Sequence, residues 1–241
     1  MLVNNRKAVA LVFAFTYRKV IALVLRSIPM EVRADLLISL DGFATTTDQT
    51  PEIPFGPDWS RLVSAYVATR TFRERVLKDT SGSGTTGMDD EYARDYFANI
   101  GAEIMGAGKF GLHNFPEDPN WKGWWGDEPP FHYPVFVLTH KTRPSIELSS
   151  TTFHFLAAEP ADALQRAVAA ANGKDVRIGG GPTVVRDFLK AGLVDRLHVA
   201  IAPILLGRGI SIWDEMRGLE AGYSVRSETA ESGTIHLTFE R

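Results

Sequence analysis

The feature that most constrains this chain is a run of three glycines inside KDVRIGGGPTVVRDFLKAGLVDRLHVAIAPILLGRG, residues 174–209. The apolar stretch before the glycines indicates a buried strand, and the stretch after them indicates a helix. Pro182 suits the first helical position, because the N–H that proline lacks would have no partner there. A second apolar strand, residues 196–205, follows. The segment therefore predicts a strand, turn, helix and strand of an α/β protein.

The glycine turn, defined here as Gly179, Gly180 and Gly181, allows two interpretations. Backbone N–H groups at a helix start lack partners and lie at the positive end of the helix dipole, so they can bind an anion such as a pyrophosphate. Thr183 would add a hydroxyl contact. In the other interpretation glycine only supplies a positive φ for a tight turn. The common nucleotide-binding signatures do not match, so the local pattern leaves both open.

The other periodic segments alternate between strands and helices. MEVRADLLISLDGFAT, from residue 30, indicates a buried first strand that ends at an Asp-Gly turn. Helices are predicted over residues 59–78 and 160–171 and from Asp89 through residue 101, and strands over 102–106 and 135–140. The last two alternating segments predict a hairpin that turns at residues 232–233. This order predicts an α/β fold with a mixed sheet and helices on its faces.

Two polar or irregular segments are predicted to be loops. DTSGSGTTG, residues 79–87, consists almost entirely of small and polar residues and predicts a mobile surface loop. Residues 110–133 are rich in Trp, Gly and Pro and show neither helical nor strand periodicity. Long ordered loops are often functional, so this one is a candidate part of a site.

Composition excludes several classes of function. The net charge of -3 and the absence of basic runs argue against a nucleic-acid partner. Without cysteine the chain has no disulfide, thiolate nucleophile or zinc-thiolate site, and an intracellular, cytoplasmic location is the default expectation. The histidines at 113, 132, 140 and 154 lack metal-ligand spacing, so no metal site is predicted.

The first 29 residues are expected to form an extension ahead of one domain over residues 30–241. KAVALVFAFTYRKVIALVLRSIPM, residues 7–30, is apolar but is interrupted by Arg18 and Lys19. The run before them is too short to span a bilayer, so no stable membrane insertion is expected. The open alternatives are a weak signal anchor, an added helix or strand, and an upstream extension of a coding region that starts at Met30.

Several of these segments together resemble a known family. ISLDGFAT, IMGAGKFG, VFVLTH, the segment around the glycine turn and the final hairpin are similar to the dihydrofolate reductase-like family. They resemble most its branch related to the C-terminal reductase domain of the bifunctional riboflavin-pathway deaminase-reductase. The resemblance covers residues 30–241. It implies a three-layer fold with a mostly parallel central sheet, helices on both faces, a C-terminal antiparallel hairpin and an NADPH site.

The resemblance also implies roles for individual residues. The nicotinamide would lie beside Ser39 to Ala44, and the pyrophosphate beside the glycine turn. The residues that the resemblance assigns to the cofactor are Ser39, Ala44, Gly106, Gly108, Lys109, Thr139, His140, Gly179, Gly180, Gly181, Pro182 and Thr183. Ala107 stands where the family commonly has an arginine that pairs with the 2′-phosphate of NADPH. Lys109, Lys141 and Arg143 are the candidate replacements.

Candidates for the chemistry itself are fewer. Reduction needs a proton donor near the nicotinamide, and Asp41 and Asp58 are the two candidate carboxylates. Each has a structural alternative, because Asp41 can cap its own turn and Asp58 can cap a helix. Trp124 and Trp125, with His132, are candidate substrate contacts in the long loop. The tryptophans can instead anchor that loop to the core or form a dimer contact.

The predicted function is an NADPH-dependent oxidoreductase that reduces a small heterocyclic or carbonyl substrate. It is similar to the riboflavin-pathway 5-amino-6-(5-phosphoribosylamino)uracil reductase and to dihydrofolate reductase, and it is expected to pair as a homodimer. The chain carries no deaminase zinc motif. Two alternatives stay open: a non-catalytic nucleotide- or ligand-binding protein that keeps the cofactor cleft, and a scaffold whose glycine turn is only structural.

Overall fold

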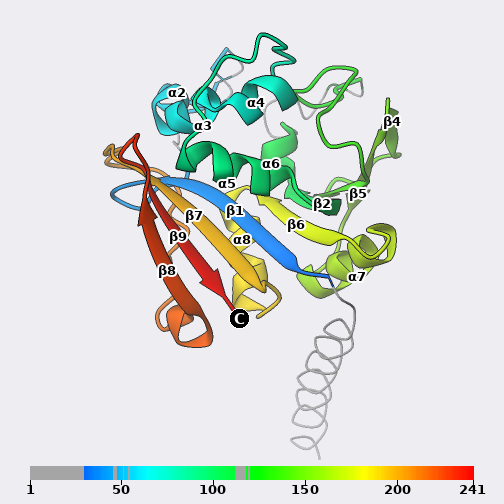
Figure 1. Ribbon diagram of the computed structural model, residues 1–241. Coiled ribbons are helices and arrows are strands. Elements are labelled where there is room, and N and C mark those ends of the chain that lie inside the picture. The colour runs from blue at the N-terminus through cyan, green and yellow to red at the C-terminus, as the bar shows by residue number, and fades with distance from the viewer. Residues whose placement is uncertain (1–29, 46–47, 51, 54, 112–117, 119) are drawn as a thin grey trace, which may run out of the picture.

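The computed structural model describes residues 30–45, 48–50, 52–53, 55–111, 118 and 120–241 (Figure 1). The interpretations given for residues 1–29 and for His113 therefore lie outside the described residues.

The described residues form one nine-stranded sheet in the order β4-β5-β3-β2-β6-β1-β7-β9-β8. Neighbouring strands from β5 to β7 pair in parallel. The two edges are antiparallel, formed by β4 on one side and by the C-terminal strands on the other. The bounds are β1 (Val32–Ser39), β2 (Ile100–Gly106), β3 (Val135–Leu138), β4 (Ile146–Leu148), β5 (Thr151–Leu156), β6 (Asp175–Gly180), β7 (Arg196–Ala202), β8 (Ser224–Thr229) and β9 (Ile235–Glu240).

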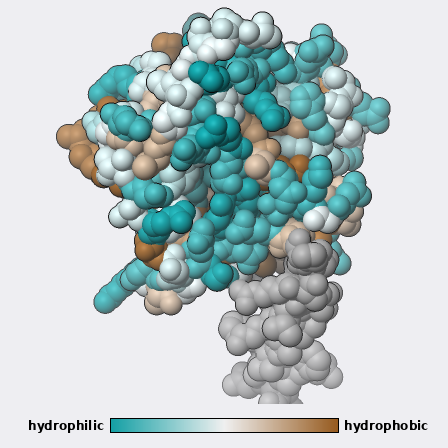
Figure 2. Space-filling model, in the orientation of Figure 1, coloured by the Kyte–Doolittle hydropathy of each residue, from teal (hydrophilic) through white to brown (hydrophobic). Residues whose placement is uncertain are grey.

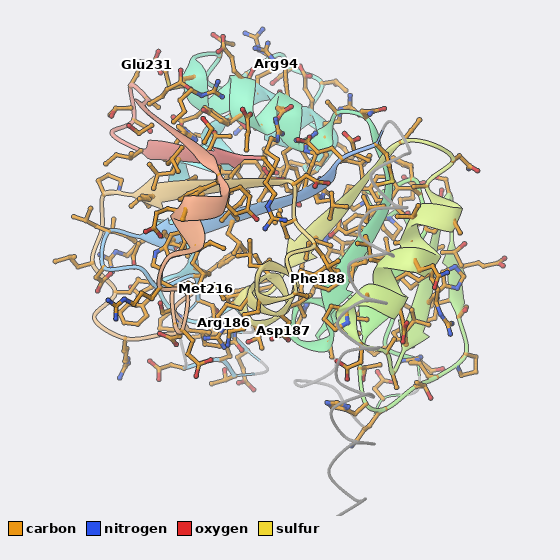
Figure 3. The ribbon with its side chains drawn as sticks, turned by 90° about the horizontal axis from the view of Figure 1, so that it is seen from below. Arg94, Arg186, Asp187, Phe188, Met216 and Glu231 are labelled. Carbon is orange, nitrogen blue, oxygen red and sulfur yellow. The ribbon has the colours of Figure 1, made fainter. Side chains whose placement is uncertain are left out.

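Helices cover both faces of the sheet, which confirms the predicted α/β architecture. One face carries α7 (Pro160–Ala170) and α8 (Pro182–Lys190). The other carries α2 (Trp59–Leu62), α3 (Ser64–Ala68), α4 (Arg70–Arg75) and α5 (Met88–Phe97). Figure 3 shows the separation: Arg94 on α5 lies on one side of the sheet, and Asp187 and Phe188 on α8 lie on the other. Two short elements complete the chain, α6 (Ala107–Phe110) and the 3-10 helix η1 (Leu219–Gly222).

The main core lies between the sheet and the α7–α8 layer. Leu164 and Ala167 of α7 and Val185 and Phe188 of α8 are buried against strand residues such as Ile178. Burying each large apolar side chain contributes about 1.5–3 kcal/mol of transfer free energy. Because the apolar side chains of α8 are buried in this core, the N-terminus of the helix is held against the end of β6.

A second apolar cluster lies under the Trp-rich loop. Phe110, Phe131 and Phe153 are buried there, and Trp121 and Trp125 pack against them. The described residues of the predicted long loop contain no helix or strand after α6. The loop is therefore held by its aromatic side chains rather than by backbone ladders.

Several segments differ from the sequence predictions, and one difference is that the helix predicted through residue 101 ends at Phe97 and β2 already begins at Ile100. The helix predicted over residues 59–78 is broken into α2, α3 and α4. The first break lies at Val63, and the second at Thr69, which is extended and whose hydroxyl accepts from the N–H of Phe72. Thr69 also forms a bridge with Thr85, which ties the predicted surface loop 79–87 to the break. The strands β4 and β5 were not predicted. Burial alternates along β5, from Thr151 to Leu156, as expected for a strand with one covered face.

The surface in Figure 2 is mostly hydrophilic, and apolar side chains are scattered over it in small groups. Scattered exposed apolar residues are normal for a globular domain. Among the described residues, the helices are too short or too polar for any of them to traverse a bilayer.

Candidate active site

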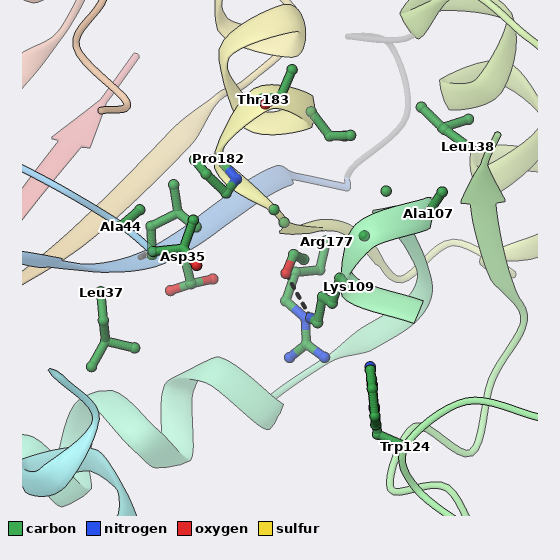
Figure 4. A pocket seen from close by; sticks show the side chains of 18 of the residues that line it. Asp35, Leu37, Ala44, Ala107, Lys109, Trp124, Leu138, Arg177, Pro182 and Thr183 are labelled. Carbon is green, nitrogen blue, oxygen red and sulfur yellow. Dashed lines mark hydrogen bonds between the residues drawn. The ribbon is translucent and has the colours of Figure 1, made fainter. Parts of the chain in front are cut away.

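A large pocket lies at the carboxyl ends of the parallel strands. Its volume is about 2070 Å³, above the roughly 300–1,000 Å³ typical of a small-ligand site. Gly106 ends β2, Leu138 ends β3 and Gly180 ends β6, and all three line the pocket (Figure 4). The pocket therefore has room for a dinucleotide and a second molecule.

Glycine occupies each of the three positions of the glycine turn for a different structural reason. A Cβ on Gly179 would lie 2.0 Å from Glu103 Oε1, so packing requires glycine there. Gly180 has a φ of +103°, which L side chains rarely adopt. At Gly181, the N-cap of α8, a Cβ would meet nothing within 4 Å. Packing therefore explains Gly179 and backbone conformation explains Gly180, while Gly181 leaves open space at the helix N-terminus.

A buried ionic network supports the glycine turn from below. Lys109 Nζ lies 3.0 Å from Glu103 Oε1 and donates to the carbonyl oxygen of Gly179 at 2.6 Å. Arg177 donates from Nε to Glu103 Oε2 at 3.0 Å, and its guanidinium lies 3.7 Å from the centre of the Tyr96 ring. Lys109, one of the predicted cofactor-binding residues, lines the pocket, but its ammonium group already binds Glu103 and the turn.

Opposing effects set the pKa values in this network. Burial by itself raises the pKa of Glu103, but the charges of Arg177 and Lys109 outweigh it and lower that pKa below its ordinary value. Burial by itself lowers the pKa of Lys109, and the Glu103 carboxylate reverses the direction. The network is therefore ionised at neutral pH, and each charge depends on its partners.

The candidate acids lie away from the pocket wall. Asp41 accepts from the Ser39 hydroxyl at 2.5 Å and from the N–H groups of Leu206 and Gly207 at 3.1 and 2.7 Å. Asp41 thus fixes its own turn to the loop after β7. Asp58 precedes α2 without a side-chain cap and pairs with Arg61 at 2.5 Å. The pocket lining includes Ala44 but not Ser39, Asp41 or Asp58.

Aromatic side chains form one wall of the pocket. Trp124 points into it (Figure 4), and its ring lies 5.1 Å from that of Phe55. Trp125 also borders the pocket but stacks on Phe153 at 5.9 Å, within the second core cluster. Of the two adjacent tryptophans, Trp124 therefore faces the pocket and Trp125 anchors the loop to the second core cluster. His132 lies outside the lining, with its ring nitrogen 2.5 Å from Ser150 Oγ.

The far end of the pocket is lined by polar residues after β3. Thr139 and His140, which the resemblance places at the adenine, line this end together with Lys141 and Arg143. The Thr139 hydroxyl accepts from the N–H of Lys141 at 3.1 Å. Ala107, in α6, lines the pocket as well. The remaining predicted residues Gly108, Pro182 and Thr183 also line it, so most of the predicted cofactor residues are brought together.

A row of four polar residues that sequence reasoning missed also lines the pocket. This Asp–His row consists of Asp35 on β1, His198 on β7, His236 on β9 and Asp89 in the first turn of α5. Asp89 was noted only as a helix start, and Asp35 could have been noticed as a charged residue in the first strand. His198 and His236 are far apart in sequence, and their spacing matches no motif.

The sheet, its two helical layers and the pocket at the strand ends define an α/β domain with the dihydrofolate reductase-like fold. Comparison with known families makes the assignment specific. The RibD C-terminal domain family model matches residues 30–235, and the chain belongs to that family, which is a family of reductases.

Solved structures of relatives match the fold over most of the chain, whereas the sequence similarity to a curated relative covers only part of it. The riboflavin biosynthesis protein RibD of Aquifex aeolicus is 41% identical over 56 residues, which are 23% of this chain and 16% of that protein. A protein from Shewanella sp. PV-4 assigned to riboflavin biosynthesis has a TM-score of 0.56 at 20% identity, covering 88% of this chain and 99% of that one.

A third relative is bifunctional. The Thermotoga maritima protein described as a diaminohydroxyphosphoribosylaminopyrimidine deaminase and 5-amino-6-(5-phosphoribosylamino)uracil reductase has a TM-score of 0.52 at 12% identity. The match covers 89% of this chain and 57% of that one. At these identities the two structural likenesses show the fold alone.

Proposed function

We propose that the protein is an NADPH-dependent reductase of a small heterocyclic or carbonyl substrate. The observation that carries the proposal is the open space at Gly181, at the N-terminus of the nine-residue helix α8 and on the wall of a large pocket. Unpaired N–H groups and the helix dipole favour an anion there, and the missing Cβ lets it approach. A pyrophosphate fits this position.

The residues of this chain then have distinct tasks. The N–H groups that follow Gly181 bind the pyrophosphate, and Thr183 adds its hydroxyl. Lys109, which Glu103 holds in place, donates to the carbonyl oxygen of Gly179 and so fixes the turn. Thr139 and His140 border the adenosine end, where Lys141 and Arg143 supply positive charge for a 2′-phosphate in place of the arginine absent at Ala107. When bound, NADPH supplies the hydride.

The other half of the pocket takes the substrate. Trp124 offers a flat apolar surface and Phe55 packs against it, so a planar ring is the favoured substrate shape. The Thermotoga relative is described as acting on an aminopyrimidine that carries a phosphoribosyl group. A substrate of this kind, and hence a step of riboflavin biosynthesis, is the first candidate.

Two measurements test the proposal in sequence. Titration of NADPH, followed through tryptophan fluorescence, is expected to give a saturable change because Trp124 and Trp125 border the pocket. Loss of NADPH absorbance is then followed with 5-amino-6-(5-phosphoribosylamino)uracil, pterins, other aminopyrimidines and quinones. No saturable fluorescence change, in protein purified free of nucleotide, contradicts cofactor binding. Binding without reduction of any compound favours a ligand-binding protein that keeps the cleft.

A further inference from the structure

The Asp–His row is a continuous chain of hydrogen-bonding contacts on the α5 side of the sheet. Asp35 Oδ1 lies 3.2 Å from His198 Nδ1, His198 Nε2 lies 3.0 Å from His236 Nδ1, and His236 Nε2 lies 3.0 Å from Asp89 Oδ1. The strands β1, β7 and β9 that carry the first three residues are neighbours in the sheet, and Asp35 and His198 are register partners. Every ring nitrogen of the two histidines is therefore used within the row.

Tyr92 holds the two imidazoles in place. Its ring stacks on His198 at 4.4 Å and on His236 at 4.0 Å, with interplanar angles of 11° and 2°. Its hydroxyl donates to Glu228 at 2.7 Å, which fixes the ring in turn. The side chains of His198 and His236 are 11% and 4% exposed. The rings are thus oriented by packing and largely shielded from water.

The contacts of the row set how many protons it can hold. With both carboxylates ionised, each end of the row needs a ring N–H, and the contact between the rings needs one more. Three protons then occupy the four nitrogens of two imidazoles, so the pair carries one positive charge. After loss of one proton, one of the three contacts has no hydrogen to bridge it. The row is therefore built to take up and release a single proton.

The Asp35 end of the row has an unused acceptor. Within the described residues, Asp35 Oδ2 has no hydrogen-bond partner, and less than 1 Å² of it is exposed to water. Asp35 projects from β1 into the pocket (Figure 4). Asp35 therefore borders the pocket and keeps one carboxylate oxygen that is shielded from water and has no donor, which is unfavourable for a buried acceptor.

We propose that the Asp–His row stores the proton that accompanies hydride transfer and delivers it to the substrate through Asp35. This inference rests on the reductase function proposed above. The hydride forms a C–H bond, and the electron pair of the substrate C=N or C=O bond moves to nitrogen or oxygen, which takes a proton from the Asp35 carboxyl. Asp35 receives that proton from His198 Nδ1, and His198 Nε2 receives one from His236 Nδ1.

These shifts leave both rings neutral and both carboxylates ionised, so the charges balance. A half-turn of the Asp35 carboxyl about its Cβ–Cγ bond moves the proton to the Oδ2 position, which has no partner among the described residues and is therefore free to donate to the substrate. After the product leaves, a water proton that enters the pocket reloads Asp35 and reverses the two shifts. Asp89 stays ionised throughout and stabilises the charged state of the rings, as a positioning residue.

The surroundings of the row make its proton labile. Burial lowers the pKa of His236, against the opposing hydrogen bond and charge of Asp89. Burial by itself raises the pKa of Asp35, but the hydrogen bond and charge of His198 outweigh it and lower that pKa. The ionisable groups that face the row from the neighbouring elements are Arg33, Tyr66, Tyr92, Arg177, Arg196 and Glu228.

The kinetic test compares Asp35→Asn and Asp89→Asn with Glu215→Gln, a matched carboxylate-to-amide control on the surface. Wild-type kcat is expected to fall as pH rises, with a midpoint below the ordinary histidine pKa. Asp35→Asn is expected to lower kcat about 100-fold, the lower end of general acid catalysis, and to remove this pH dependence. Asp89→Asn is expected to keep the fall of kcat with rising pH but to move its midpoint to lower pH, because the charged histidine rings lose the neighbouring carboxylate. Glu215→Gln leaves both unchanged.

Two results separate the inference from the function on which it rests. A wild-type protein that oxidises NADPH with none of the compounds overturns the reductase function. A wild-type protein that reduces one of them, while Asp35→Asn keeps its kcat and pH profile, overturns proton delivery alone. A loss of stability in both Asp variants with unchanged pH profiles assigns the row a structural role and also overturns delivery.

A second measurement needs no substrate. Long-range proton–nitrogen NMR of the histidine rings, assigned with His198→Gln and His236→Gln, follows the protonation of the intact protein with pH. The expected result is that the two rings take up one proton jointly, below the ordinary histidine range. Independent uptake of two protons, or rings that stay neutral down to pH 5, contradicts the proton count and overturns the inference.

Discussion

The glycine-turn half of the pocket and the Asp–His half differ in how they are assembled. The first is made of backbone from one contiguous segment, the end of β6 and the start of α8. The second is made of side chains from β1, β7, β9 and α5, which are brought together by sheet order and by one helix. A site made of backbone can be recognised from adjacent glycine and proline residues in the sequence. A site made of side chains that are distant in sequence produces no local pattern.

The two halves also differ in what they require of each residue. In the glycine turn, Gly179 is required by packing, Gly180 by its backbone conformation, and Gly181 leaves open space for a ligand. In the Asp–His row, each residue is specified by the hydrogen bonds of its neighbours. Substitutions in the two halves should therefore have different main effects, on the stability of the fold or on binding and catalysis. The following predictions test that difference.

The largest expected effect is on the network beneath the glycine turn. Glu103→Gln removes the negative charge that faces Arg177 and Lys109, both of which bind it. Because a buried charge is then left uncompensated, the free energy of unfolding should fall by about 3–5 kcal/mol in urea denaturation. Asp79→Asn, which breaks an ion pair near the surface, is the control. Equal small losses for the two variants contradict the bracing role of Glu103.

Next in size is the effect of a methyl group at Gly179. A Cβ there meets Glu103 Oε1 at 2.0 Å, so Gly179→Ala should destabilise the protein by about 1–3 kcal/mol through overpacking. Thermal unfolding without cofactor measures this directly. An unchanged transition means that the turn can relax and that packing is not the reason for this glycine.

Gly181→Ala is the matched variant for binding. Gly181 has a φ of -71°, and its Cβ meets nothing within 4 Å, so the apo protein should keep its stability. The methyl group fills the space assigned to the pyrophosphate, and NADPH affinity should fall about tenfold or more, equal to about 1.4 kcal/mol. Fluorescence titration gives the affinity. Wild-type affinity in this variant removes the phosphate role of the turn.

Acid should destabilise the fold through both halves of the pocket. The pKa values of Glu103 and Asp35 are lowered in the folded protein, so each carboxylate contributes stability that is lost as pH falls through its folded pKa. The lowered pKa of His236 acts in the same direction, because the unfolded chain binds its proton first. Urea midpoints at pH 7, 5.5 and 4 should decrease in that order. Asp35→Asn should flatten the decrease.

The smallest expected effect is on cofactor preference. Lys141 is exposed at the far end of the pocket, so Lys141→Ala should weaken NADPH binding only a few-fold, in line with about 0.2–1 kcal/mol for an exposed charge pair. NADH affinity should not change, because that cofactor lacks the 2′-phosphate. Parallel titrations of the two cofactors test this. Equal changes for both would assign Lys141 a role unrelated to the phosphate.

Much of the fold could be predicted because its signals are local. The first strand, α5, the unit around the glycine turn and the C-terminal hairpin all follow from apolar periodicity and turn residues. The helix predicted over 59–78 is interrupted at Thr69 because that residue pairs with Thr85, a contact that its own segment does not encode. The edge strand β4 has only three residues, too few to show a period, whereas the alternation along the six residues of β5 was present in the sequence and was missed.

The candidate site divides along the same line. Glycine, proline and the loop motifs carried the predictions from Gly106 to Lys109 and from Gly179 to Thr183, and these residues meet in one pocket. The carboxylates chosen from sequence were those next to turns and helix starts, and neither lines the pocket. Asp58 pairs with Arg61, and Asp41 accepts from N–H groups of the loop after β7. Asp35 lies in the middle of a strand, where only its neighbours across the sheet give it a role.

The sequence by itself determined the α/β architecture, the family resemblance and the backbone half of the pocket, because periodicity and glycine conformation act over a few adjacent residues. Only the tertiary structure decided which carboxylate faces the pocket and which histidines adjoin it. The physical reason is that hydrogen bonds between side chains depend on distance in space. Asp35 and His198 are adjacent in the sheet although 163 residues separate them in the chain.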